Sequence, residues 1–322
     1  MSFASRTCLA AAALAVLVVG QQTRAVLIVN DPFLIGSDLS SGQYDTTVRL
    51  NSATSVPTVL GMVSTGWTGG AGTSQPHVVA GTLDVSGAGY ESGGKVQFDS
   101  APIDGVYRSN ARTIVTPYTS AGANGPLYIS GIVATDPFAA IPADNGLRGY
   151  ALMGFTNTIG ANTTGTLAGY YLGFRANADD SMSLILRHRN GTASTLADIV
   201  LLPVANPSTD YQFILRTDVN VIGGNQETVH WWINPSDVTS ETTATNTALA
   251  AGTFNDYSLQ NSTADISRLT VATYNWDATS YYDEFRMGTT FLDVAGAATP
   301  EPASLSLLAI PALLTLRRRT HI

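Results

Sequence analysis

Hydrophobic and polar residues alternate with a period of two through much of the chain. Between residues 211 and 221, one set of alternate positions carries Tyr211, Phe213, Leu215, Thr217, Val219 and Val221. The positions between them include the polar residues Gln212, Arg216, Asp218 and Asn220. Successive side chains of an extended strand point to opposite sides, so this pattern predicts a strand with one buried face. Residues 228–234 repeat the pattern, with Val229, Trp231 and Ile233 opposite His230 and Trp232.

Similar short stretches recur between Gly, Asn, Asp and Pro residues, and no segment of the body shows a sustained helical stripe. Residues 169–189 are predicted to form two strands joined by a turn at Asn177, Asp179 and Asp180. The Ser- and Thr-rich residues 236–250 are predicted to form a long solvated loop. Many short strands at this spacing predict an all-β fold, either a sandwich or a barrel. No linker marks a second domain.

The first 25 residues have the features of a secretory signal peptide. Arg6 precedes an apolar stretch from Cys8 to Val19, and the small residues Thr23 and Ala25 stand before the expected cut. This order predicts export and cleavage after Ala25.

The C-terminus is apolar and then basic. Residues 303–316 carry no charge, and Arg317, Arg318 and Arg319 follow directly. A helix of that length would rise about 21 Å, and the arginine stems can make up part of the distance to a hydrocarbon core of about 30 Å. The leucines would point all round the helix, and Pro311 would kink a packed one. We therefore expect a short transmembrane helix and not a packed helix of the domain.

Together with Pro300, Glu301 and Pro302, this tail resembles a PEP-CTERM sorting signal. The resemblance implies a Gram-negative bacterium with exopolysaccharide, transient membrane insertion, and processing near the Pro-Glu-Pro motif by an exosortase. It also implies a cell-surface or extracellular-matrix location. The expected divisions are a signal peptide (1–25), one β-sandwich (26–297) and a sorting signal (298–322).

Three body segments, "DPFLIGSDLSSGQY", "VHWWINP" and "YYDEFRMGTTFLDV", occur in that order. They resemble the concanavalin A-like (laminin G-like) domains of sorted surface proteins from planctomycete-type bacteria. The resemblance covers most of residues 26–295 and implies an antiparallel jelly-roll β-sandwich. It also implies that a last strand over residues 282–291 pairs near the first. Such domains include lectins and glycosidases, and some hold calcium in acidic loops.

Charge narrows the choice of partners. Removing Arg6, Arg24 and the three tail arginines leaves 11 of 16 basic residues against all 24 acidic ones, a net charge of −13. Such a charge argues against nucleic acid and anionic membrane surfaces as partners. Cys8, the sole cysteine, leaves with the signal peptide, so the mature domain has no disulfide.

Candidate chemistry is sparse. No strand carries alternate acidic residues of the kind that retaining glycosidases place in one cleft. Asp283 and Glu284 are adjacent and should face opposite ways on a strand, and no Gly-x-Ser-x-Gly motif occurs. His77, His188 and His230 are interpreted as surface strand positions. We therefore predict no catalytic residues and no enzymatic activity.

Two binding hypotheses stay open. Asn177, Asp179 and Asp180 could hold calcium, although the same residues suit a turn, so no cofactor is expected apart from this alternative. Carbohydrate binding requires exposed aromatic rings, for which the candidates are Trp276, Trp232, Tyr281 and Tyr282. Trp276 lies in a predicted loop and is the best exposed candidate, whereas Trp231 is expected in the core.

The leading functional hypothesis is an exported, non-enzymatic surface or matrix protein that is sorted by its tail. The alternative is a carbohydrate-binding module acting on exopolysaccharide. A glycoside hydrolase or lyase is a third hypothesis.

Overall fold

The computed structural model describes residues 27–31, 33, 50, 59–63, 67–69, 76–83, 85, 93–100, 107–118, 126–138, 149–157, 169–179, 181–189, 196–222, 226–256 and 266–296. The predicted signal peptide with its cut after Ala25 lies outside these residues. The predicted sorting signal also lies outside them, with its residues Pro300, Glu301, Pro302, Arg317, Arg318 and Arg319. Among the helices of the described residues, none has the length and hydrophobicity needed to span a bilayer.

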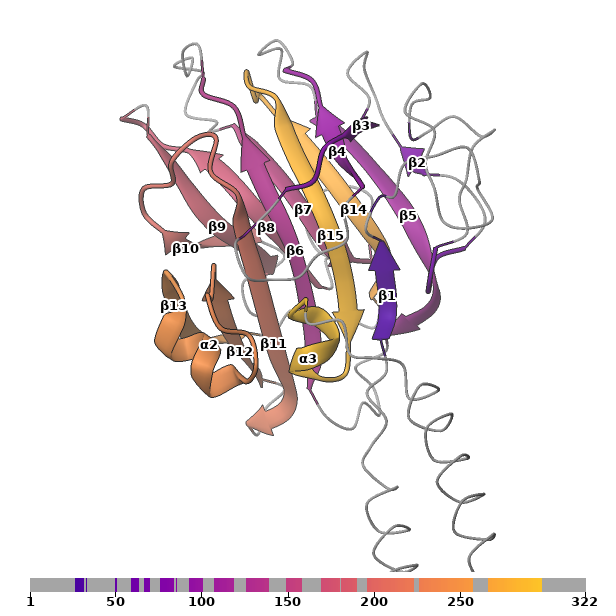
Figure 1. Cartoon of the computed structure of the whole chain (residues 1–322), viewed down its shortest axis with the longest axis vertical. Helices are drawn as coiled ribbons and strands as arrows, with labels where there is room; N and C mark the ends of the chain where they lie inside the picture. Colours follow the sequence, from indigo (N-terminus) through magenta and orange to yellow (C-terminus); the bar gives the residue numbers. More distant parts are fainter. Residues whose placement is uncertain are drawn as a thin grey trace, which may run out of the picture.

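Two antiparallel sheets pack face to face in the described part of the chain, which confirms the predicted β-sandwich (Figure 1). The sheet that we call the front sheet has the strand order β13-β12-β11-β6-β15-β4-β3, and β1 pairs with β15. Its strands are β1 (Leu27–Asp31), β3 (His77–Ala80), β4 (Gly94–Phe98), β6 (Leu127–Thr135), β11 (Tyr211–Ile222), β12 (Gln226–Ile233), β13 (Ala250–Asp256) and β15 (Ser280–Gly288).

The back sheet has the order β10-β9-β8-β7-β14-β5-β2. Its strands are β2 (Thr68–Gly69), β5 (Tyr107–Tyr118), β7 (Tyr150–Thr156), β8 (Gly169–Ala176), β9 (Met182–Arg189), β10 (Leu196–Leu202) and β14 (Ile266–Tyr274). Neighbouring strands of this sheet are antiparallel.

Alternation along the strands supplies the core between the sheets. On β11, Phe213 and Leu215 belong to the main core, whereas Ile214 belongs to a separate cluster on the outer face of the front sheet. This outcome confirms the predicted period of two. Fully buried aromatic side chains from both sheets meet in the core, including Phe98, Phe155, Phe174, Phe213, Tyr282 and Phe285. Each such ring removed from water stabilises the fold by about 2 kcal/mol.

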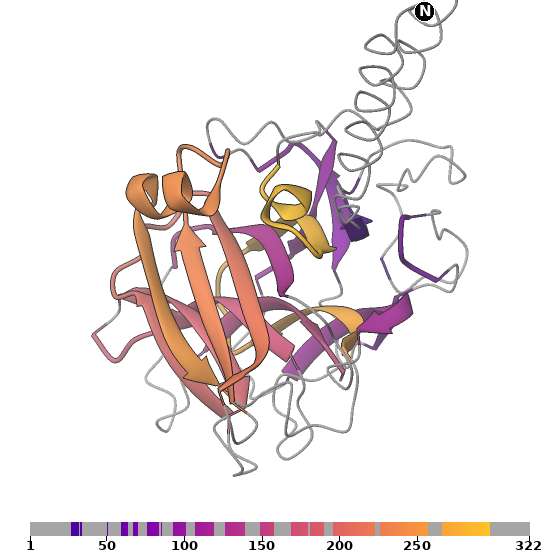
Figure 2. The same ribbon diagram turned by 90° about the horizontal axis from the view of Figure 1, so that it is seen from below.

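Two short helices lie on the outer side of the front sheet, where Figure 2 shows them from below. Helix α2 spans Glu241–Thr247, and helix α3 spans Phe291–Val294. The prediction of an irregular loop over residues 236–250 is therefore wrong. A capping box between Ser240 and Thr243 satisfies backbone donors at the start of α2, and buried Ala244 packs it against the sheet.

A bulge in β15 changes the direction of its acidic residues. The register against β6 shifts between Asp283 and Arg286, and Glu284 adopts a left-handed backbone with φ of 53°. The Glu284 carboxylate contacts Arg286 at 2.9 Å. Burial raises the pKa of Asp283 well above its usual range, and the charges of Glu284 and Asp31 raise it further. Tyr282 and Phe285, on either side of this pair, both belong to the main core. Strict alternation therefore fails at the bulge, and the prediction that the two carboxyl groups face opposite ways is wrong.

The chain enters and leaves the described fold at the same end. Leu27, the first residue of β1, pairs with Gly288, the last residue of β15, and α3 follows directly. Figure 1 shows β1 and α3 at the lower end of the sandwich. The expected pairing of the last strand with the first is confirmed, although that strand ends at Gly288 and residues 291–294 are helical.

Candidate functional site

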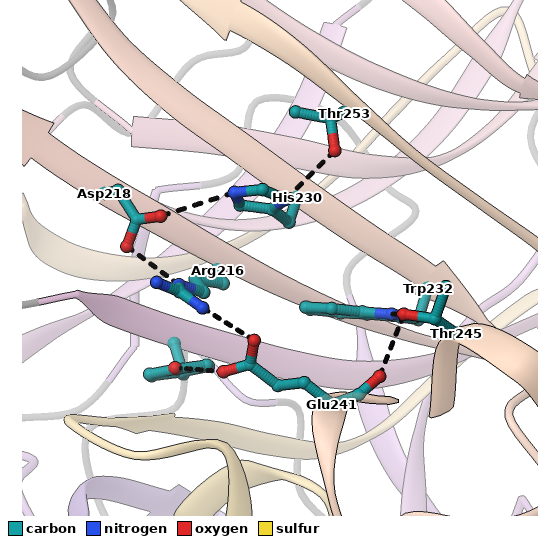
Figure 3. Close-up of polar contacts among 8 residues, drawn as sticks. Arg216, Asp218, His230, Trp232, Glu241, Thr245 and Thr253 are labelled. Carbon is teal, nitrogen blue, oxygen red and sulfur yellow. Dashed lines mark hydrogen bonds and ion pairs between the residues drawn. The ribbon is translucent and has the colours of Figure 1, made fainter. Parts of the chain in front are cut away.

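A line of polar side chains crosses the outer face of the front sheet beside helix α2 (Figure 3). We call it the outer polar network, and it consists of Thr253, His230, Asp218, Arg216, Glu241 and Tyr128. Strand register sets its geometry: Arg216 on β11 is paired with His230 on β12, which is paired with Thr253 on β13. Three neighbouring strands therefore present these side chains in one row on the same face.

Arg216 is the centre of the network. Its Nε donates to Asp218 Oδ1 at 2.8 Å, and its Nη1 donates to Glu241 Oε2 at 2.6 Å. Burial alone would lower the pKa of Arg216, but the hydrogen bonds with Asp218 and Glu241 outweigh it and raise the pKa above its usual value. Arg216 thus stays charged and ties the sheet to the first turn of α2.

Glu241 also holds Tyr128 of strand β6. The Tyr128 hydroxyl donates a short hydrogen bond to Glu241 Oε1. Burial raises the pKa of Tyr128 above its usual range, and the bond to Glu241 raises it further. The hydroxyl therefore keeps its proton and remains a donor at neutral pH.

His230 continues the network toward the sheet edge. Its Nε2 lies 3.3 Å from Asp218 Oδ2, and its Nδ1 lies 3.0 Å from Thr253 Oγ1. The imidazole is stacked on the Trp232 ring, with centroids 6.4 Å apart and planes at 19°. Trp232 is in turn fixed by a 2.8 Å hydrogen bond from its Nε1 to Thr245 Oγ1 of α2. Few of these side chains can rotate without breaking a contact.

Solvent reaches the network. The side chains of Arg216 and Glu241 are 30% exposed, His230 is 32% exposed, and Thr253 lies in an exposed position. With Asp218 and Glu241 ionised and His230 neutral, the group carries a net charge of −1. It combines donors, acceptors and a flat imidazole, which is the chemistry that recognises hydroxyl-rich ligands.

Two other polar clusters are less accessible. On the outer face of the back sheet, Asp198 pairs with Arg187 at 2.7 Å and with Arg175 at 3.1 Å, but these side chains are only 12 to 18% exposed. The Arg187 guanidinium lies over the Tyr150 ring at 4.2 Å. Asp283 and Glu284 are fully buried. A ligand would therefore reach the outer polar network more readily than either cluster.

The predicted sugar-stacking rings are not on the surface. Trp276 follows β14 as expected of a loop residue, but it is 1% exposed and packs against Phe138 and Phe174. Its Nε1 donates to Thr135 Oγ1 at 3.2 Å. Trp232 lies on the outer face as its alternation predicts, but it is buried beneath α2. The expectation that these two rings are exposed is wrong.

The structure also tests the predicted positions of Trp231 and of the three histidines. Trp231 packs against the main core, as predicted, and His230 is a half-exposed strand residue, also as predicted. The surface assignment of His188 is wrong, since it is buried and packs on Phe254. His77 is half-buried on β3.

The predicted turn after β8 is present. Asn177 donates from its backbone N to the carbonyl of Ser181 at 2.8 Å, and Asp179 Oδ1 accepts from the Ser181 hydroxyl at 2.6 Å. Asp179 thus hydrogen-bonds within the turn itself. Asp180 lies outside the described residues. No cluster of three or more potential metal-binding His, Cys, Asp or Glu residues occurs in the part of the chain that the structure describes.

The sequence pattern does not predict the outer polar network. Alternation placed Arg216, Asp218 and His230 on polar strand faces, which was correct. It could not give the register that joins them to Thr253. The available signal for Glu241 was the Ser240-x-x-Thr243 spacing that encloses it. A capping box usually has Glu or Gln at the third helical position, where this chain has Thr243.

No protein-family model matches the chain, and no curated protein matches it. Among solved structures, the chain is similar to an endo-β-1,4-glucuronan lyase from the fungus Trichoderma reesei, with 12% identity and a TM-score of 0.40 over 71% of this chain and 93% of that one. An alginate lyase from Chlorella virus is 10% identical with a TM-score of 0.40, covering 66% of this chain and 89% of that chain. The potassium-bound carbohydrate recognition domain of Emp46p is 10% identical with a TM-score of 0.39, covering 69% of this chain and 87% of that chain.

At identities of 10 to 12%, these likenesses concern the fold. They also correct the sequence-based prediction of a non-enzymatic surface protein. The similar structures include glucuronan and alginate lyases, so the prediction that the chain is not an enzyme is withdrawn.

Proposed function

We propose that the domain binds polysaccharide through the outer polar network. The observation that carries this proposal is a solvent-accessible row of Arg216, His230 and Thr253, in which Asp218 and Glu241 hold Arg216, and Asp218 also contacts His230. Sugar hydroxyl groups both donate and accept hydrogen bonds. A guanidinium, a carboxylate and an imidazole in fixed positions can satisfy several of them without losing much side-chain freedom.

Neutral sugars suit this surface better than acidic ones. Arg216 is matched by two carboxylates, so the network does not supply an unneutralised positive charge for a uronate. The chain as a whole carries a net charge of −8 and would repel a polyanion. We therefore infer a hydroxyl-rich, uncharged stretch of an exopolysaccharide as the ligand.

We further propose that the chain is exported and sorted as a PEP-CTERM protein. Arg6 and the apolar stretch before Ala25 support export, and Pro300 to Pro302 with the terminal arginines support processing by an exosortase-type enzyme at the membrane. The pairing of Leu27 with Gly288 supports this proposal, since both targeting segments would then attach at one end of the sandwich. The protein would reach the cell surface or the extracellular matrix of a Gram-negative bacterium.

Binding is tested with a glycan array followed by affinity electrophoresis in the polysaccharide that scores best. Glu241→Gln and His230→Ala should each weaken binding at least about tenfold, which corresponds to about 1.4 kcal/mol. His77→Ala on strand β3, at the opposite edge of the same sheet, is the matched control and should bind like the unaltered protein. Unchanged affinity in both network variants, with their folds intact by circular dichroism, would refute the proposal.

Sorting is tested separately by cell fractionation and mass spectrometry of the mature C-terminus. The expected product is an exported chain that has lost its terminal arginines. Cytoplasmic protein that retains an intact "LRRRTHI" end would defeat this part of the proposal.

A further inference from the structure

Three members of the outer polar network form a hydroxyl–imidazole–carboxylate line across the sheet. Thr253 Oγ1 lies 3.0 Å from His230 Nδ1, and His230 Nε2 lies 3.3 Å from Asp218 Oδ2. Figure 3 shows the imidazole between the two partners, with Thr253 on one side and Asp218 on the other. A histidine that only faces solvent on a strand would not need a partner on each of its two ring nitrogens.

The partners fix where the imidazole proton lies. An ionised carboxylate can only accept hydrogen bonds, so the proton of neutral His230 lies on Nε2, facing Asp218. Nδ1 then carries the lone pair, and the Thr253 hydroxyl must donate to it. This polarity prepares the hydroxyl to lose its proton to the imidazole.

Further contacts hold Asp218 and His230 in place and leave Thr253 accessible. Asp218 Oδ1 accepts from Arg216 Nε at 2.8 Å, which orients the carboxylate toward His230. The imidazole stacks on Trp232, and α2 covers that indole. Thr253 lies in an exposed position on β13, an edge strand of the front sheet, so a small acyl compound can approach its oxygen.

We propose that Thr253 is a nucleophile toward acyl esters, with His230 as general base and Asp218 as the group that orients it. Thr253 Oγ1 forms a bond to the carbonyl carbon while its proton passes to His230 Nδ1. The ester C–O bond breaks, and the alcohol leaves with that proton. Water then attacks the threonine ester, gives its proton to His230, and releases the carboxylic acid as Thr253 regains its proton.

The substrate class follows from the surrounding surface and rests on the proposed polysaccharide binding. An O-acyl group, such as an acetyl ester on a sugar hydroxyl, would place its carbonyl beside Thr253 while the sugar hydroxyls face Arg216 and Glu241. The ester is uncharged, as the net negative network requires. Cleavage would remove acyl groups and leave the polysaccharide backbone intact.

The chemistry is tested on the purified full chain with p-nitrophenyl acetate, which needs no polysaccharide. Nitrophenol release should exceed the solvent rate, and peptide mapping after acid quenching should find the acetyl group on Thr253. Thr253→Val, which keeps the side-chain shape, should lower release at least about tenfold. Thr253→Ser keeps a hydroxyl and should release nitrophenol faster than Thr253→Val. Thr116→Val, at an exposed threonine on β5, is the matched control and should behave like the unaltered protein.

The role of the imidazole has its own readout. His230→Gln, which keeps a polar side chain but removes the general base, should lower nitrophenol release about as much as Thr253→Val does. Release that is unchanged in folded Thr253→Val, acetylation at another residue, or release no faster than in buffer would each overturn the proposal. Ester cleavage without polysaccharide binding would refute only the proposed ligand, whereas binding without cleavage would refute only the nucleophile.

Discussion

Trp276 gives a sharp test of the packing, because its sequence context suggested an exposed ring. Trp276→Ala would remove an indole that is 1% exposed and that packs edge-on against Phe138, with ring centroids 4.6 Å apart. Replacing a buried aromatic residue by alanine costs roughly 3–5 kcal/mol through lost burial and the cavity left behind. Thr135 accepts the indole N–H and also donates to the Thr279 carbonyl. Because Thr135 keeps that second bond in the variant, loss of the indole hydrogen bond adds little. We expect a decrease in the free energy of unfolding of about 4 kcal/mol.

Urea unfolding followed by far-UV circular dichroism measures this change. With a slope of about 3 kcal/mol per molar urea, the midpoint should fall by about 1.3 M. Trp276→Phe should lose only about 1–2 kcal/mol, because a ring remains between Phe138 and Phe174. An exposed ring would shift stability by no more than about 0.5 kcal/mol on truncation. A Trp276→Ala midpoint equal to that of the unaltered protein would therefore show that the packing of this loop is wrong.

Further predictions concern α2, two carboxyl groups and a buried phenol. Ser240→Ala should lower the free energy of unfolding by about 1 kcal/mol because the capping box of α2 is lost, and Ser240→Gly should cost less; equal stability in calorimetry would contradict the cap. Burial raises the pKa of Asp198, but its hydrogen bonds and charge contacts with Arg187 and Arg175 outweigh this and lower it. The stabilisation is thus present above the unfolded pKa of about 4 and lost as pH falls through the folded pKa, so Asp198→Asn should be less stable at pH 7 with a deficit that shrinks in acid. Burial raises the pKa of Asp283, and the charge of Glu284 adds to this effect, so its ionisation should weaken the fold as pH rises above about 4. Asp283→Asn should lack that decline. If the stability of a variant and that of the unaltered protein change in parallel from pH 3 to 8, the corresponding carboxyl prediction is contradicted. Burial and the charge of Glu227 raise the pKa of Tyr118 to about 12, so Tyr118→Phe should remove one late step from the ultraviolet titration of the tyrosines.

Alternation made the sandwich predictable where one face of a strand is apolar. Residues 211–221 follow a period of two, and their apolar positions Phe213 and Leu215 lie in the core. Burial of one face allows only one register, so the sequence pattern and the fold agree there.

The pattern is ambiguous where polar residues face inward. On β5, Arg112 pairs with Leu269 of β14 and so shares its inward face, although its charge suggests solvent. It is fully buried, lies 3.8 Å from Asp31 of β1, and donates to the Val63 carbonyl. Partners distant in sequence compensate the buried charge, and a local pattern contains no information about them.

Helix α2 was missed for a different reason. Residues 241–247 are four threonines with Glu241, Ala244 and Asn246, and threonine and asparagine are weak helix formers. The helix forms because Ser240 and Thr243 cap it, Ala244 packs on the sheet, and Glu241 is held by Arg216. Tertiary contacts override the local propensity. The same contacts create the candidate site, which explains why neither could be predicted.

The most direct test of polysaccharide binding is a crystal structure of the protein soaked with an oligosaccharide from the best array ligand. Sugar hydroxyls within hydrogen-bonding distance of Arg216, His230 or Glu241 are the predicted result. An oligosaccharide seated instead on the outer face of the back sheet, with the outer polar network untouched, would contradict the proposed site.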